Sequence, residues 1–152
     1  VDGVTLPRMA FLRGRGALSI SRDVYSGYLK HYGEEHEETV REGNNYSALL
    51  QQIQRYEEAK SLLRKLMPVA RRVLGEGDDQ AIRIGWSYGE ALYHADGATL
   101  DELREAVTTL EETARSARRI LGNTHPLTGG IEGSLRAARA RLRARETPPV
   151  NP

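Results

Sequence analysis

The chain has 152 residues with 22 basic and 21 acidic side chains, and its formal net charge at pH 7 is +1. This length predicts one domain. Because the positive and negative charges nearly balance, the chain has no strong overall electric field that would attract nucleic acid or a membrane surface. Cysteine is absent, which excludes disulfides, thiolate zinc sites and cysteine nucleophiles. Hydrophobic residues make up 39% of the chain, enough to bury a core.

The N-terminal region carries no signal-peptide pattern, and no apolar run approaches the ~20 residues that span a bilayer. We therefore expect an intracellular protein, either cytoplasmic or organellar. Because the first residue is Val1 rather than methionine, we also expect a longer precursor or a targeting segment that has been removed. Residues 1–16 include Pro7, Gly14 and Gly16, which disfavour a helix, and they are predicted to be irregular.

A repeated pattern then organises residues 17–145, the predicted repeat domain. Three similar segments occur at residues 32–39, 74–81 and 121–128, with the sequences YGEEHEET, LGEGDDQA and LGNTHPLT. Their glycines are 42 and 47 residues apart, and an alanine precedes each glycine by sixteen residues. This double register indicates a repeat protein. The marker residues are Gly33, Gly75 and Gly122, with Ala17, Ala59 and Ala106.

Between these markers the apolar residues follow a helical period. Steps of three and four run from Tyr56 to Val73 and from Leu103 to Leu121, and they predict two long amphipathic helices. Shorter helices are predicted over about residues 39–53 and 81–95. The five extra residues of the second unit fall near residues 94–103, at a turn where an insertion costs little. Pro68 should bend its helix or remove one hydrogen bond.

Small residues recur where neighbouring helices must approach closely. The three marker alanines lie on the longer helices, and Ser47 and Gly89 take the same role on the shorter ones. We expect Ala59 and Ala106 to be buried, because a larger side chain there would overpack the interface. At the end of the chain, the narrow apolar stripe of Leu135, Ala138 and Leu142 predicts a capping helix, followed by a disordered tail over residues 146–152.

Several of these motifs resemble the tetratricopeptide repeat of the kinesin-light-chain type. The resemblance rests on RRILGNTHPLT at residues 118–128, NNYSALL at 44–50 and RYEEA at 55–59, and it covers about residues 17–142. It implies an all-α fold, a right-handed α-solenoid of antiparallel helix pairs. Three stretches depart from the family pattern: Asp78-Asp79, Trp86 to Gly89, and Gly133 to Arg136, where a bulky arginine at a packing position suggests a register slip of one residue.

The same resemblance implies a protein or peptide partner, bound in a groove that the first helix of each unit lines. An asparagine at residue 44 or 45 would clamp the backbone of the partner, and Trp86 would either anchor the partner or pack under the neighbouring helix. The residues implied for this groove are Arg41, Asn44, Asn45, Ala48, Gln51, Gln52, Arg83, Trp86, Glu90, Tyr93 and His94.

No catalytic residue, cofactor or metal site is predicted. The HEETV sequence that starts at His36 lacks the second histidine of a zinc-protease motif. His31 and His36 lie among glutamates, an arrangement that we interpret as an acidic loop over a helix start rather than a metal site. No glycine-rich stretch has the spacing of a phosphate loop, and no serine has the surroundings of a catalytic nucleophile.

The sequence therefore favours a non-catalytic interaction module, a scaffold or adaptor, or an accessory subunit of a larger assembly. Two alternatives stay open. The chain could be a fragment of a larger enzyme, or it could bind RNA through an arginine-rich end. We do not expect nucleic acid as the partner, because no aromatic residue is interleaved with these arginines. They are Arg136, Arg139, Arg141, Arg143 and Arg145.

Overall fold

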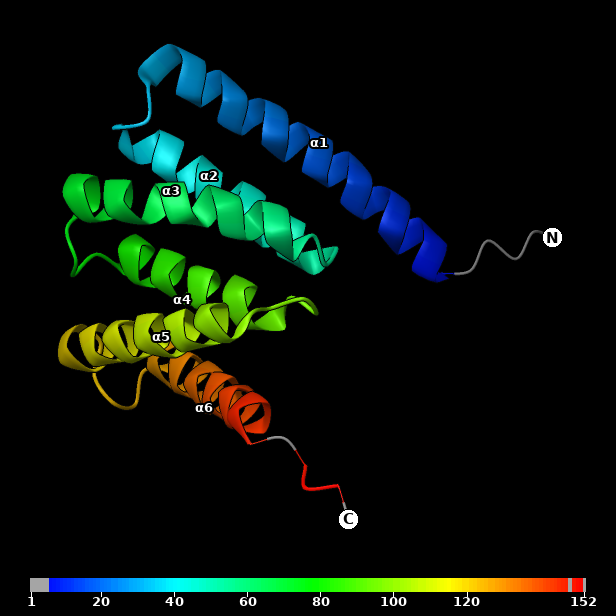
Figure 1. Ribbon diagram of the computed structural model, residues 1–152. Coiled ribbons are helices and arrows are strands. Elements are labelled where there is room, and N and C mark those ends of the chain that lie inside the picture. The colour runs from blue at the N-terminus through cyan, green and yellow to red at the C-terminus, as the bar shows by residue number, and fades with distance from the viewer. Residues whose placement is uncertain (1–5, 148, 152) are drawn as a thin grey trace.

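The computed structural model describes residues 6–147 and 149–151, and side-chain surroundings from Gly16 onward. Within these residues the chain folds into six helices without a strand, which confirms the all-α prediction (Figure 1). Successive helices run back and forth in a stack. The helices are α1 (Leu6–Tyr32), α2 (Glu37–Gln52), α3 (Tyr56–Leu74), α4 (Asp79–His94), α5 (Leu100–Ile120) and α6 (Pro126–Glu146).

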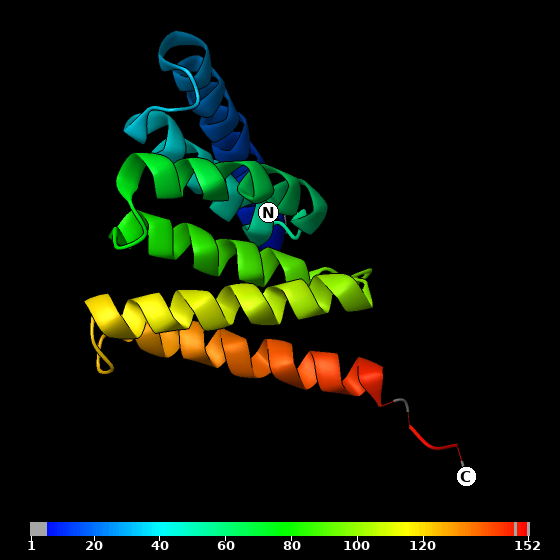
Figure 2. The ribbon, with the colours of Figure 1, turned by 60° about the vertical axis from the view of Figure 1, so that its left-hand side comes forward.

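The six helices form two layers. Each helix packs against the next one in the chain, and in addition α2 packs against α4 and α4 against α6. Helices α2, α4 and α6 therefore form an inner layer, and α1, α3 and α5 form an outer layer, as the stacked order in Figure 2 illustrates. Helix α4 has neighbours on four sides, which explains why Ile82, Ile84, Ala91 and Leu92 are buried in its short length. None of the described helices is long and apolar enough to cross a membrane.

The prediction of an irregular segment over residues 1–16 is wrong from Leu6 onward, because α1 already begins there. Pro7 is the second residue of this helix. An N–H group in the first turn makes no hydrogen bond within the helix, so proline is tolerated there. Each interior glycine costs about 1 kcal/mol relative to alanine, which a helix of 27 residues can absorb. Residues 1–5 lie outside the described part of the chain. At the other end α6 continues to Glu146, so the predicted tail of residues 146–152 begins one residue too early. Its disorder stays a prediction.

The repeated joins have a common geometry. Their glycines have φ values of 79°, 86° and 93°, in the left-handed region where a side chain is strained. Three residues after each glycine lies the N-cap of the next helix, and the side chain of this residue accepts a backbone N–H from the first turn of the helix. The three N-cap residues are His36, Asp78 and His125. Histidine and aspartate both provide such an acceptor. Asp78 therefore caps α4 as the two histidines cap α2 and α6.

Small residues bring the two layers together. Ala59 and Ala106 are fully buried, as predicted, and Ser47 is buried opposite them in the inner layer. At Gly89 an added Cβ would lie 2.5 Å from Cγ of Leu110, so that only glycine fits there. Ala17 differs, because it is exposed on α1. The expectation of a close helix approach at Ala17 is therefore wrong, since no inner helix of the described chain lies beside it.

Two departures from the repeat pattern have simple structural outcomes. The buried residues of α6 include Leu135 and Ala138, while Arg136 is exposed. The packing register of α6 is therefore shifted by one residue relative to α2 and α4, which turns the arginine out to solvent. Pro68 is exposed within α3, which continues across it as one helix, at the cost of the hydrogen bond that its missing N–H would have made.

A row of ion pairs connects the outer helices α3 and α5. Lys60 is 6% exposed, and its Nζ lies 2.7 Å from Glu57 and 2.5 Å from Glu102. Glu102 also accepts the backbone N–H of Thr99 in the capping box that starts α5. The hydrogen bond from Lys60, with that from Thr99, lowers the pKa of Glu102. Burial opposes the charge on Lys60, yet its bonds to the two glutamates leave its pKa raised.

Replacing Ala59 with leucine should destabilise the protein by about 1–3 kcal/mol, because the added atoms have no space between the layers. The matched control is Ala17→Leu, at the equivalent but exposed position of α1, which should change the free energy of unfolding by less than about 0.5 kcal/mol. Urea denaturation of the two variants measures the difference. Equal stability of Ala59→Leu and the wild type would contradict the packing described above.

Replacing Lys60 with methionine should cost about 1.5–3 kcal/mol at neutral pH, since a charged hydrogen bond to Glu102 is lost. Because folding lowers the pKa of Glu102 below its ordinary value of 4.5, the bond between Lys60 and Glu102 contributes fully to the free energy of unfolding above that pH. The contribution is lost as the pH falls through the folded-state pKa of Glu102. Urea denaturation at neutral pH and near about pH 3 should therefore show the variant approaching the wild type in acid. The control is Lys65→Met, at an exposed position of the same helix. A deficit independent of pH would contradict the assignment.

Candidate functional site

The inner layer presents one line of exposed side chains on α2. Arg41, Asn45, Ala48 and Gln52 are exposed at spacings of four, three and four residues, which places them on one side of the helix. Asn44 and Gln51 are half-buried beside this line. Nε2 of Gln51 donates to the backbone oxygen of Ser87 at 3.2 Å and so connects α2 to α4. The sequence prediction therefore includes both exposed residues and residues that join helices.

Helix α4 continues the same surface. Arg83 and His94 are exposed at the positions equivalent to Arg41 and Gln52, and Glu90 is half-buried between them. We call the exposed side chains at these repeat-equivalent positions of α2 and α4 the inner face. It consists of Arg41, Asn45, Ala48, Gln52, Arg83 and His94.

Both arginines of the inner face already have carboxylate neighbours on their own helices. Arg41 pairs with Glu37 and Glu38, and Nε of Arg83 lies 2.8 Å from Asp79. About half of each arginine side chain is exposed. Exposed pairs within a helix contribute only about 0.3–0.5 kcal/mol. An incoming carboxylate can therefore replace the acidic neighbour at little cost.

Trp86 lies between α4 and α6. Its Nε1 donates to Oγ of Ser134 at 2.8 Å and to Oε1 of Glu90 at 3.1 Å. Ser134 also donates to Glu90. The ring covers Gly130, where an added Cβ would lie 2.6 Å from it. Of the two placements that the sequence allowed for Trp86, the structure shows the one in which the ring packs against the neighbouring helix. Its N–H is hydrogen-bonded within the chain.

Tyr93 and His94 occupy the end of α4. Tyr93 is 7% exposed, and burial, with the nearby charge of Glu90, raises its pKa. It is therefore part of the hydrophobic core. His94 lies at the surface, 5.7 Å from the ring of Tyr56 in a stacked arrangement, and its Nε2 is 2.6 Å from Glu90. These two rings line a shallow hollow of about 420 Å³ that also includes Gln54 and Asp96.

The arginines of α6 do not form a free basic patch. Arg139 bonds to Glu111 of α5, and Arg141 and Arg145 donate to the backbone oxygens of Ala95 and Ala98. Three of the five arginines thus hold α6 against α5 and against the segment between α4 and α5. Arg136 and Arg143 are exposed.

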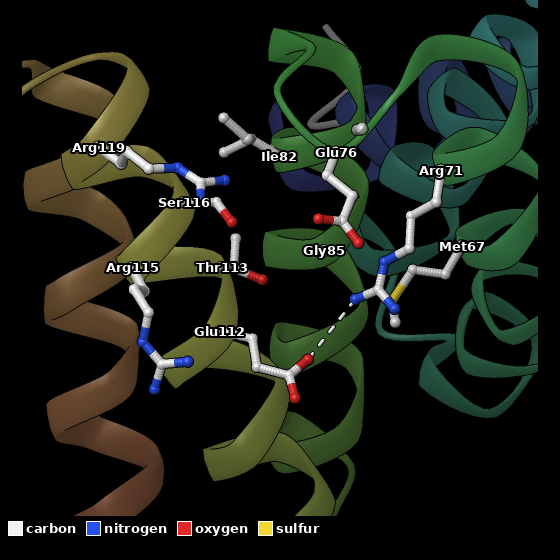
Figure 3. A pocket seen from close by; sticks show the side chains of 11 residues that line it. Met67, Arg71, Glu76, Ile82, Gly85, Glu112, Thr113, Arg115, Ser116 and Arg119 are labelled. Atoms are coloured by element: carbon white, nitrogen blue, oxygen red, sulfur yellow. Dashed lines mark ion pairs between the residues drawn. The ribbon is translucent and has the colours of Figure 1, made fainter.

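The outer side has hollows that the sequence did not indicate. A hollow of about 410 Å³ opens between α3, α4 and α5 (Figure 3). Arg71 of α3 and Glu112 of α5 approach across it at 3.6 Å, and Arg119 extends from the same helix as Glu112. A second hollow of about 470 Å³ lies between α1, α2 and α3 and is lined by more apolar residues, among them Leu62 and Leu66. These hollows form where two outer helices stand apart over the back of an inner helix.

The two histidines at the first join, His31 and His36, both contact the ring of Tyr32. His31 contacts Tyr32 edge-on, and His36 stacks on Tyr32 with a centroid distance of 4.6 Å. Nδ1 of His36 also accepts the backbone N–H of Glu38 as a helix cap. Within the described residues, no group of three or more His, Asp or Glu side chains is arranged to hold a metal ion.

Comparison with known families identifies a tetratricopeptide repeat at residues 44–80. The matched segment starts within α2, includes all of α3 and ends at the start of α4. It contains the central part of the inner face and the buried Ala59. The match supports a repeat protein of the tetratricopeptide type. A search of curated proteins gives no match.

Replacing Trp86 with alanine should lower the stability of the fold by about 2 kcal/mol or more, because the ring fills the space over α6. Trp86→Phe retains most of this packing and should lose only about 1 kcal/mol, for the missing hydrogen bonds. Thermal unfolding followed by circular dichroism compares the two variants. A fully stable Trp86→Ala variant would show that the ring is a surface side chain instead.

Proposed function

We propose that the chain is a non-catalytic protein-interaction module that holds an extended segment of a partner along the inner face. Tetratricopeptide repeats are typical of proteins that bind other proteins, which supports the general assignment. The observation that carries the choice of surface is the line of exposed side chains on α2 and α4. The repeat of 42 residues and its join motif favour the kinesin-light-chain type as the subtype.

The chemistry of the inner face suits a peptide backbone. Asn45 and Gln52 are exposed carboxamides on the same side of α2, and each has both donors and acceptors for the N–H and C=O groups of a main chain. Ala48 lies between them and leaves room for the segment to approach. Asn44 lies beside this line and is half-buried. The exposed Asn45 is therefore the better candidate for the backbone clamp.

The charges at the edge of the inner face favour an acidic side chain in the partner. Arg41 and Arg83 occupy equivalent positions on the two helices, and their guanidinium groups can form paired hydrogen bonds with a carboxylate. Because their present ion pairs are exposed and weak, this exchange is possible without unfolding the helix starts. We infer a partner segment that combines backbone contacts at Asn45 and Gln52 with a carboxylate at one arginine.

The test is co-purification of partner protein from cell extract with the full chain as bait. Asn45→Ala combined with Gln52→Ala should weaken the affinity for the partner about thirtyfold, since two hydrogen bonds of about 1 kcal/mol each are lost. Arg83→Glu should also weaken retention by reversing the charge. Thr108→Ala, at an exposed position of the outer helix α5, is the matched control and should retain the partner fully.

Circular dichroism first establishes that each variant is folded. Full retention by the inner-face variants would contradict the proposal, and the partner would then bind the outer layer or α6. Loss of the captured material after ribonuclease treatment, with a steep dependence on salt, would instead support the RNA alternative.

A further inference from the structure

The hollow between α3, α4 and α5 differs in charge from the equivalent hollow one unit earlier, between α1, α2 and α3. The register of the join glycines relates the positions of the two. Arg71 stands at the position of Leu29. Glu112 stands at the position of Lys65 and lies 3.6 Å from Arg71. These two new charges therefore offset each other within the hollow.

Arg119 lacks the carboxylate that its equivalent residue binds. In the earlier unit Arg72 forms an ion pair with Glu35 of the preceding join. Arg119 is equivalent to Arg72, but the position of Glu35 is occupied by Gly77. Because glycine has no side chain, the join cannot supply the carboxylate. The later unit thus keeps the arginine of this pair without its acidic partner.

Arg115 adds a second cation beside Arg119. It stands at the position of Pro68, one helical turn before Arg119 and on the same side of α5. Both arginines are exposed, and Figure 3 shows them on the wall that α5 forms. The neighbouring glutamates of α5 already pair with arginines of α3 and α6. Among the described residues, no ion pair joins either arginine to an acidic side chain.

The lining of the hollow suits the side chain of an acidic residue. Three arginines and two glutamates line it, with a formal sum of +1, which one added carboxylate would balance. Met67 and Ala81 are half-buried there and offer apolar contact to the CH₂ groups of such a side chain, and Ser116 adds a hydroxyl beside the arginines. The volume of about 410 Å³ lies within the range of about 300–1,000 Å³ that is typical of ligand sites, so the hollow accommodates more than a single ion.

We propose that Arg115 and Arg119 bind the carboxylate of an acidic side chain in a peptide segment that occupies this hollow. The carboxylate takes the place at Arg119 that Glu35 has at Arg72, and Arg115 contributes further charged N–H donors. This interaction goes beyond the inner-face function, since it uses the outer layer and none of the inner-face residues. Either of the two can therefore fail without the other.

The probe is a blocked tetrapeptide with two central glutamates, and its isosteric control has glutamines in their place. Titration into the ¹⁵N-labelled full chain is followed through the arginine Nε–Hε signals in NMR spectra. The signals of Arg115 and Arg119 should shift saturably with the acidic peptide and not with its control. Arg119→Gln should weaken binding about tenfold or more, because a charged hydrogen bond is lost. Arg136→Gln removes the same charge from an exposed position of α6 and should leave binding unchanged.

A second variant keeps every arginine and restores the missing acid. Gly77→Glu should pair with Arg119 in the way that Glu35 pairs with Arg72, and so exclude the peptide. A Cβ added at Gly77 lies 3.1 Å from Cδ1 of Ile120, the end of an exposed side chain that can move aside. Gly77→Gln is the matched control, because it has the same size without the charge, and it should retain binding.

Three results would overturn the proposal. One is undiminished binding of the acidic peptide by Gly77→Glu. Another is a set of shifts confined to Arg41 and Arg83, which would assign the peptide to the inner face alone. The third is an equal shift of Arg115 and Arg119 with sodium acetate at the same carboxylate concentration, which would indicate a site for a free carboxylate rather than for a peptide.

Discussion

The close approach of the inner and outer helices is the constraint on which the rest of the structure depends. Leu110 occupies the space that a side chain at Gly89 would need, and Ala106 is fully buried between the helices. A single helix pair could not bury its apolar sides alone, so each pair also depends on the next one in the stack. The inner face exists only because these contacts hold α2 and α4 side by side, with Gln51 bonded across to Ser87.

This arrangement creates two surfaces of different chemistry at different places. The inner face is polar, with carboxamides and arginines that are exposed or weakly paired, and it suits a main chain with an acidic side chain. The exposed side of α1 carries the apolar side chains of Ile20 and Val24, which no described helix covers. At the opposite end of the stack no large hydrophobic side chain of α6 is exposed, and Arg139, Arg141 and Arg145 anchor this helix to α5 and to the segment before α5. The two ends of the stack are therefore not equivalent.

The sequence predicted those features that repeat and missed those that depend on neighbours. The join glycines, the approximate bounds of α2 to α5 and the burial of Ala59 followed from local rules of period, capping and volume. The exposure of Ala17 could not be predicted in this way, because it depends on which helix is absent beside it. Trp86 was ambiguous for the same reason, since its packing partner in α6 is 48 residues away. The outer hollows depend on the separation of α3 from α5, which no local pattern encodes.

Amide hydrogen exchange of the isolated chain, resolved by residue, tests most directly the claim that each helix depends on its neighbours in the stack. Exchange should be slowest in α4, which is packed on four sides, and intermediate in α3 and α5. It should be fastest in the α1 segment from Ala17 to Val24, whose outer side is uncovered. The account would be contradicted if this segment were as protected as the equivalent segment of α3, or if α4 exchanged as rapidly as α1.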